Sequence, residues 1–128
     1  MVTKQKGREV IVRWIETISS RDITALDQLA DESCTVDYVW HFPGVTHLPP
    51  GPAGAKQICR GILADHPGIR GELEDLVAGR DRVAWRCTWR RMDPATGKSQ
   101  RLTGMVISRF VGDQIAEEWE LLSPWEDD

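Results

Sequence analysis

Two glutamates near the end of the chain, Glu118 and Glu120, are spaced in a way that suits acid and base chemistry. They lie two positions apart in an alternating segment, so a strand would point both side chains to one face, about 7 Å apart. In an apolar setting two such carboxylates raise each other's pKa, and a glutamate can then donate a proton near neutral pH. The pair is therefore a candidate proton-transfer site.

Arg86 and Arg90 lie in a second alternating segment and would share one face with Thr88. A guanidinium near Glu120 could hold that carboxyl group ionised, or could bind an oxyanion of a substrate. The pattern alone leaves both roles open. It also leaves open a surface position for these side chains, with the tryptophans of the same segment facing the core.

Other candidates precede the proline-rich part of the chain. His41 could act as a general base or as a hydrogen-bond donor near a substrate carbonyl, and Tyr38 and Trp40 could position a ligand or simply pack in the core. His47 and His66 are interpreted as loop residues. No histidines, cysteines and acids have the spacing of metal ligands, and no glycine-rich stretch has the context of a nucleotide site. Neither a metal nor a cofactor is expected.

The composition limits the class of partner. The chain has 128 residues, 16 Lys and Arg against 20 Asp and Glu, and a formal net charge of -4. No basic patch is present that could follow a nucleic-acid backbone, and no apolar stretch reaches the roughly 18 to 20 residues that span a bilayer. We expect a cytoplasmic protein of one domain, residues 1–128, that binds neither nucleic acid nor membrane. Three scattered cysteines favour buried thiols over disulfides or zinc, namely Cys34, Cys59 and Cys87.

The first half of the chain predicts helices around one strand. Apolar residues recur at three and four between Lys6 and Ser19, the period of an amphipathic helix, and Asp22 is placed to cap a second one. Alternation over 34–40 predicts a strand, and apolar spacing over 55–63 predicts a third helix. One face of this strand would hold Cys34, Val36, Tyr38 and Trp40. Between the strand and the third helix lies a loop from His41 to Gly54, of which the proline-rich part, Pro43 to Gly54, is expected to close over the pocket and to contribute to its entrance.

The second half predicts strands joined by short turns, which places neighbouring strands antiparallel. Their ranges are Ile69 to Ala78, Arg82 to Arg91, Ser99 to Val111 and Gln114 to Leu122. Helices followed by such a meander predict an α+β domain in which the helices cover one face of the sheet.

Four stretches, together with this order of elements, resemble the SnoaL-like branch of the nuclear transport factor two superfamily. The likeness covers nearly the whole chain. It implies a cone-shaped, curved, mixed or antiparallel sheet packed on three helices from the N-terminal half and enclosing one pocket. The stretches are His47 to Gly54, Glu74 to Ala78 with Asp81 to Ala84, Pro94 to Lys98, and Gly112 to Glu120.

The resemblance also implies roles for particular residues. A catalytic aspartate of the SnoaL-like cyclases, and one of the related limonene epoxide hydrolases, both fall on Glu120. Where the cyclases place a cavity histidine, this chain has Val106. In the epoxide hydrolases an Asp, Arg, Asp relay opens the epoxide; its arginine matches Arg86, but its middle aspartate falls on Thr88.

In the family one face of the sheet lines the pocket and the other packs on a second subunit. This predicts that the carboxylates and arginines point inward. It also predicts a homodimer through an outer face that carries Trp85, Trp89 and Trp119.

The resulting hypothesis is a cofactor-free enzyme that acts on a hydrophobic, oxygenated small molecule, such as a polyketide intermediate, by acid and base catalysis. The predicted catalytic group comprises Glu120, Glu118, Arg86 and His41. The predicted substrate contacts are Tyr38, Trp40, Thr88, Arg90, Val106, Leu102 and Trp14. Two alternatives remain: epoxide opening of the limonene-epoxide-hydrolase type, and a ligand-binding or dimerisation module without catalysis.

Overall fold

The computed structural model describes residues 1–128, which form three helices and a mixed sheet. The sheet has the order β1-β5-β4-β3-β2, β1 runs parallel to β5, and β6 adds to the edge of β4. The elements are α1 (Lys4–Ser20), α2 (Ile23–Ser33), β1 (Cys34–His41), α3 (Pro52–Asp65), β2 (Arg70–Ala78), β3 (Arg82–Met92), β4 (Ser99–Val111), β5 (Gln114–Leu122) and β6 (Glu126–Asp127). The α+β prediction is confirmed.

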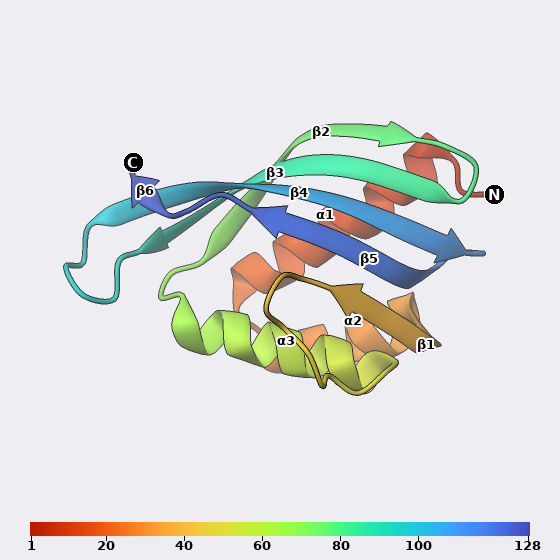
Figure 1. The fold of residues 1–128 in the computed structure, drawn as a ribbon, viewed down its shortest axis with the longest axis horizontal. Helices are drawn as coiled ribbons and strands as arrows, with labels where there is room; N and C mark the ends of the chain where they lie inside the picture. The colour runs from red at the N-terminus through yellow and green to blue at the C-terminus, as the bar shows by residue number, and fades with distance from the viewer.

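The helices lie together on one side of the curved sheet, as Figure 1 shows. Both N-terminal helices are capped as their sequences suggest: Thr3 accepts a hydrogen bond from the N–H of Lys6, and Asp22 accepts one from Ala25. The apolar stripe of α1 then packs onto the sheet, with Ile11 and the other members of the main core cluster fully buried. This packing leaves the opposite face of the sheet uncovered by any helix.

The third helix begins earlier than the pattern predicts. It starts at Pro52, a residue that suits the first turn because it lacks the N–H that would be unpaired there. Gly51 precedes it with a φ of 79°, and a side chain there would meet the carbonyl oxygen of Val36 at 2.5 Å. Glycine is therefore required where the proline-rich loop enters α3.

An irregularity in β1 changes which residues face inward. The pairing of β1 with β5 shifts between Cys34 and Val39. As a result Tyr38 is buried while Val36 is 89% exposed. The prediction that Val36 and Tyr38 share one face of this strand is therefore wrong, because a bulge breaks the simple alternation.

A second bulge sets the faces of β4 and β5. The register shifts between Arg109 and Phe110, so that Val106 pairs with Glu120 and Ile107 pairs with Trp119. Across β4, Val106 also pairs with Trp85 on β3. Trp85 and Trp119 therefore lie on opposite faces of the sheet. The predicted outer row of three tryptophans is wrong, since Trp119 lines only the outer groove, Trp89 lines only the interior cavity, and Trp85 borders both.

Other predictions about the chain can be compared directly with the structure. The bounds of β4 and β5 agree with those predicted, and Cys34, Cys59 and Cys87 are buried free thiols. Burial raises the pKa of the Cys59 and Cys87 thiols to about 12, so both stay protonated. None of the helices is both long and apolar enough to span a membrane.

Candidate functional site

An interior cavity of about 130 Å³ lies between the sheet and the helices α1 and α3. Its wall is apolar apart from a few polar groups that reach it from different elements. Ligand pockets usually measure about 300–1,000 Å³, so this cavity has room for the reacting part of a larger molecule. The side chains that line this cavity include Trp14, Tyr38, Trp40, His66, Trp85, Trp89, Leu102, Glu118, Glu120, Leu122 and Trp125.

Glu118 and Glu120 both project from β5 into this cavity. Their direction follows from the bulge in the β4–β5 pairing, which turns the even-numbered residues of this stretch toward the helices. Glu120 stands in a row with Val106 and Trp85, which are its paired neighbours across β4 and β3. The structure thus brings the predicted pair of carboxylates together in an apolar setting.

Glu118 is held by hydroxyl groups from two neighbouring strands. The Tyr38 hydroxyl donates to Oε1 of Glu118 at 2.7 Å, and Ser108 Oγ donates to Oε2 at 2.5 Å. Ser108, itself fully buried, accepts from the indole Nε1 of Trp85 at 3.0 Å. Every donor in this series of hydrogen bonds is directed toward Glu118, which suits an ionised carboxylate because that group can only accept hydrogen bonds. Glu118 is therefore the carboxyl group best able to carry the negative charge.

Glu120 lacks such a chain of donors, and its acidity differs accordingly. Burial, followed by the negative charge of Glu118, raises the pKa of Glu120 to about 8, while the Trp40 indole opposes the rise. Burial also raises the pKa of Glu118, against the hydrogen bonds from Ser108 and Tyr38. The pKa of Tyr38 is raised well above its usual range, first by burial and then by Glu118, so its hydroxyl remains a donor. At neutral pH Glu120 is accordingly protonated and close to its ionisation point.

The three predicted site residues of β3 lie outside the cavity. Because Trp85 and Trp89 take the inner face of β3, Arg86, Thr88 and Arg90 must take the outer one. Thr88 Oγ1 donates to an oxygen of a neighbouring glutamate at 3.0 Å, and Arg90 Nε lies 3.1 Å from an oxygen of the C-terminal aspartate. The prediction that these side chains point into the cavity is wrong, and the relay that needs Arg86 is absent from the cavity.

His41 also lies on the outer face. Its Nε2 is 2.6 Å from Oε2 of Glu117, and its ring stacks on Trp119 with a centroid distance of 5.3 Å. The hydrogen bonds from His41 and then Arg109 lower the pKa of Glu117, opposite to the shift of the inward glutamates. The structure therefore places His41 at the outer groove and not in the interior cavity, and its catalytic role stays a prediction. The other predicted contacts with a substrate, Tyr38, Trp40, Leu102 and Trp14, do line the cavity, and Val106 lies on its sheet wall.

The proline-rich loop borders a different hollow from the expected one. Residues from Val45 to Pro50 line a space of about 220 Å³ that shares Tyr38, Trp40 and Ile58 with the interior cavity. None of the residues from Pro43 to Gly54 lines the interior cavity itself. The loop is thus a neighbour of the cavity, separated from it by β1 and α3, rather than part of its entrance.

Several residues of the cavity were missed in the sequence. Trp85 and Trp89 lie on a strand that was predicted but whose inner face was assigned wrongly, whereas Ser108 lies on the correctly assigned inner face of β4 and was not singled out. His66 and Trp125 come from a loop and the C-terminal segment, where periodicity gives no signal. The buried alternation of β4 at Leu102, Val106 and Ser108 is the pattern that could have fixed the inner face of its neighbours.

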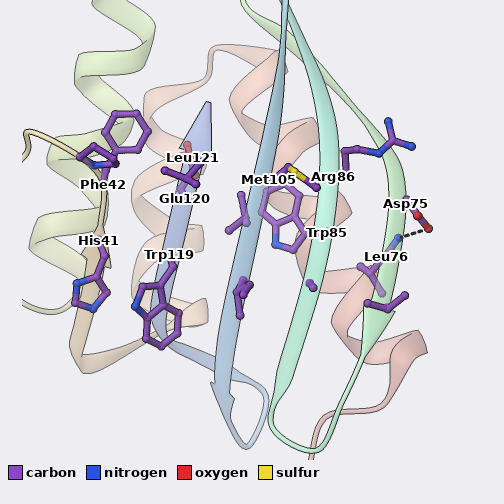
Figure 2. Close-up of a pocket in the computed structure, with 15 residues that line it drawn as sticks. His41, Phe42, Asp75, Leu76, Trp85, Arg86, Met105, Trp119, Glu120 and Leu121 are labelled. Carbon is purple, nitrogen blue, oxygen red and sulfur yellow. Dashed lines mark hydrogen bonds between the residues drawn. The ribbon is translucent and has the colours of Figure 1, made fainter. Parts of the chain in front are cut away.

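The outer face of the sheet carries a shallow groove of about 690 Å³. Figure 2 shows His41 and Trp119 together at one edge of this groove and Arg86 and Asp75 at the other. Between these edges lie apolar side chains that are strongly exposed, including Met105 at 60% and Leu121 at 64%. The groove has no pair of buried carboxylates. No group of three metal-ligating side chains is arranged to hold an ion anywhere in the structure.

A helix-covered cavity with two carboxylates on the last long strand of a mixed sheet defines a class of small α+β proteins, and the comparisons with known proteins agree with that class. The sequence profile of the SnoaL-like domain matches residues 11–118. The chain belongs to the SnoaL-like domain family. No curated protein matches it significantly.

Solved structures with the same fold include several that are named as enzymes. IdmH from Streptomyces antibioticus, named as a candidate polyketide cyclase, is 26% identical, with 91% of each chain covered and a TM-score of 0.74. A candidate polyketide cyclase from Acidithiobacillus ferrooxidans is 21% identical over 96% of this chain and 92% of that one, with a TM-score of 0.78. AclR from Streptomyces galilaeus, named as a candidate hydroxylase, is 18% identical over 94% and 81%, with a TM-score of 0.75.

Proposed function

We propose that the protein is an enzyme that closes a ring in a hydrophobic, oxygenated small molecule by moving a proton within the interior cavity, with Glu120 as the group that moves it. The observation that carries this proposal is the pair of inward carboxyl groups. Glu118 accepts hydrogen bonds from two hydroxyl groups, whereas Glu120 has a pKa of about 8 and can gain or lose a proton near neutral pH. Membership of the SnoaL-like family and the neighbours named as polyketide cyclases favour ring closure over other acid and base reactions.

One carboxyl group is sufficient for an aldol-type ring closure. The Glu120 carboxylate removes a proton from a carbon next to a carbonyl group, which leaves an enolate. The enolate carbon attacks a second carbonyl of the same molecule, and the new alkoxide oxygen takes the proton back from the Glu120 carboxyl group. One proton moves from carbon to oxygen and nothing else is consumed, so the reaction needs no other reactant.

Glu118 makes this exchange possible by staying charged. Each of its two oxygens already accepts a hydrogen bond, one from the Tyr38 hydroxyl and one from the Ser108 hydroxyl, which stabilises its negative charge. Burial, and then the negative charge of Glu118, raise the pKa of Glu120 to about 8. A general base works best when its pKa lies near the working pH, so Glu118 acts on Glu120 rather than on the substrate.

Epoxide opening has weaker support from the geometry. That reaction needs one carboxylate to activate water while an acid protonates the epoxide oxygen, and the relay that resembles this site uses an arginine. Here the matching Arg86 lines the outer groove, which Glu120 also borders, but does not line the interior cavity into which Glu120 projects. The observations therefore favour proton transfer at carbon.

The proposal can be tested without the natural substrate by following exchange of the α-protons of 2-tetralone, a two-ring ketone, in D₂O by NMR. We expect the protein to accelerate exchange over buffer, with a rate that rises with pH around 8 as Glu120 ionises. If 2-tetralone binds but exchange is not accelerated, the proposed catalysis is refuted and the protein is a ligand-binding module. An acceleration that does not change between pH 6 and 9 would exclude Glu120 as the base.

We also propose that the outer groove binds a second copy of this chain through a two-fold axis. Contiguous exposed apolar side chains on a sheet face are typical of an interface, and here they include Met105, Ile107 and Leu121. The groove also carries one acid and one base without an ion-pair partner in the chain, Asp75 and Arg86. A two-fold axis would let each meet the opposite charge of the other copy.

A further inference from the structure

The interior cavity contains two N–H donors that no group of the chain accepts. Trp14 Nε1, on α1, is buried and has no hydrogen-bond partner. His66, which follows α3, has a partner at Nδ1 but none at Nε2. Of the two donors only the Trp14 indole N–H is buried, and leaving it without an acceptor costs roughly 1–3 kcal/mol, so proteins keep such a group mainly where a ligand or an ordered water satisfies it. His66 is partly exposed, and its Nε2 has no acceptor in the chain. Both residues line the cavity that contains Glu120.

The contact with Arg91 fixes which nitrogen of His66 carries the proton. Arg91 Nη1 lies 2.8 Å from Nδ1 of His66. A guanidinium can only donate, so Nδ1 must accept and the neutral ring must carry its hydrogen on Nε2. Burial and then the charge of Arg91 lower the pKa of His66, which keeps the ring neutral at pH 7. His66 is therefore a hydrogen-bond donor with a fixed tautomer and not a general base.

The surroundings of His66 hold the ring in place. The guanidinium of Arg21 donates to the backbone oxygen of His66 at 3.1 Å and to that of Leu63 at 2.8 Å, which anchors the end of α3. Trp125 packs against the imidazole at a centroid distance of 5.4 Å, and the Arg91 guanidinium lies 4.3 Å from the centroid of the same indole. A donor fixed in this way loses little entropy when it binds an acceptor.

The geometry points to His66 and Trp14 as a polar subsite of this cavity that binds an acceptor oxygen of the ligand, a carbonyl or carboxylate, other than the oxygens of the reacting carbonyl groups. Arg91 is a positioning residue of this subsite because it acts through His66. The inference rests on the proposed function in that both use the same cavity. It adds that the ligand carries an acceptor oxygen in addition to the reacting carbonyl groups.

The test uses two probes of nearly the same shape, 2-acetylnaphthalene and 2-ethylnaphthalene, which differ in one carbonyl oxygen. Their affinities are measured by quenching of tryptophan fluorescence. We expect the wild type to bind the ketone roughly 3-fold to 10-fold more tightly, as one to two hydrogen bonds would give. His66→Phe and Trp14→Phe should each reduce this ratio, whereas His47→Gln, in the proline-rich loop, should leave it unchanged. A third probe, 2-naphthoate, shows whether a carboxylate is preferred to a carbonyl.

A ratio that stays the same in His66→Phe would overturn the inference, as would failure of all three probes to bind the wild type. Long-range ¹H–¹⁵N correlation of the imidazole gives a readout independent of binding. We expect hydrogen on Nε2 of His66 in the wild type and a loss of this preference in Arg91→Met; hydrogen on Nδ1 in the wild type would contradict the assignment. The same ratio measured in Glu120→Gln separates the two proposals, because the subsite should survive even where proton transfer fails.

Discussion

The two faces of β5 contain neighbouring glutamates in opposite electrostatic situations. Glu117, on the outer face, contacts His41 and Arg109, and its pKa is lowered. Glu118 and Glu120, on the inner face, are surrounded by apolar side chains, and their pKa values are raised. The three residues share one strand and one side-chain chemistry. The direction of each side chain from the sheet therefore decides whether the carboxyl group is a surface ion or a proton donor.

The β-bulge between Arg109 and Phe110 assigns these directions. If the pairing continued regularly from the turn that joins Val111 to Gln114, Val106 would face Trp119, and Trp119 would point into the cavity. The observed shift pairs Val106 with Glu120 instead. One inserted residue exchanges the two faces of a strand, so this bulge places the carboxylates inside and leaves an aromatic ring for the outer face.

The largest difference between the faces should appear in catalysis. Glu120→Gln removes the proton-transferring group while keeping the shape of the side chain, so we expect proton exchange on 2-tetralone to fall by about 100-fold to 10,000-fold. Glu117→Gln is the matched control on the outer face and should keep most of the rate. Equal rates for the two variants would refute the assignment of Glu120.

The pH dependence of stability should differ in the same way. The pKa of Glu120 rises from 4.5 to about 8 on folding, so the folded state binds this proton more tightly than the unfolded state. Its stabilising contribution is complete below pH 4.5 and is lost as the pH rises through 8, at up to about 1.4 kcal/mol per pH unit. Urea unfolding between pH 5 and 8 should show a shallower decline for Glu120→Gln, and parallel curves for the two proteins would contradict this.

The sequence predicted the elements of the site better than the orientation of their side chains. Alternation fixed the bounds of β4 and β5 because their apolar and polar residues alternate over most of each strand. Alternation shows that a strand has two faces, however, and does not say which face is inside. The tryptophans of β3 and Trp119 of β5 look equivalent in the sequence, and only the bulge separates them.

Contacts between residues far apart in the sequence could not be predicted from the alternation of apolar and polar residues. His66 and Trp125 meet at the cavity although 58 positions separate them in the sequence. The chain from Trp85 through Ser108 to Glu118 crosses three strands and exists only in the folded register. The resemblance to a family indicated Glu120 and the spacing indicated Glu118, whereas Ser108, which holds Glu118, had no sequence signal.

Charge on the outer face should disrupt self-association and leave the cavity intact. Ile107 and Leu121 are 42% and 64% exposed in the groove. We expect Ile107→Lys with Leu121→Lys to halve the mass measured by light scattering at micromolar concentration, because like charges then meet across the two-fold axis. Exchange of 2-tetralone protons by this variant should persist. A wild type with the mass of one subunit would exclude the proposed interface.

Removal of one hydroxyl from the inner face should have a smaller effect on stability. Ser108→Ala leaves the Trp85 indole N–H without its acceptor and Glu118 without one donor. We expect the free energy of unfolding to fall by roughly 1–3 kcal/mol. Ser99→Ala, at an exposed serine on the same strand, serves as the control. A loss of stability of the same size in this variant would show that the buried hydrogen bonds of Ser108 contribute no more than a surface hydroxyl.

The smallest effect is expected from Arg86, and it is the most direct check on the assignment of the two faces of β3. The resemblance to epoxide hydrolases would make Arg86 part of the reaction, and its loss would then lower turnover severely. In the structure Arg86 is exposed in the outer groove and has no ion-pair partner. Arg86→Gln should therefore change the rate of 2-tetralone exchange by less than about twofold and the free energy of unfolding by less than about 0.5 kcal/mol. The variant and the wild type are compared at a protein concentration at which dimerisation would be complete, because Arg86 borders the proposed interface. A loss of exchange as large as that of Glu120→Gln would show that Arg86 takes part in the reaction. The assignment of the inner and outer faces of β3 would then have to be reversed.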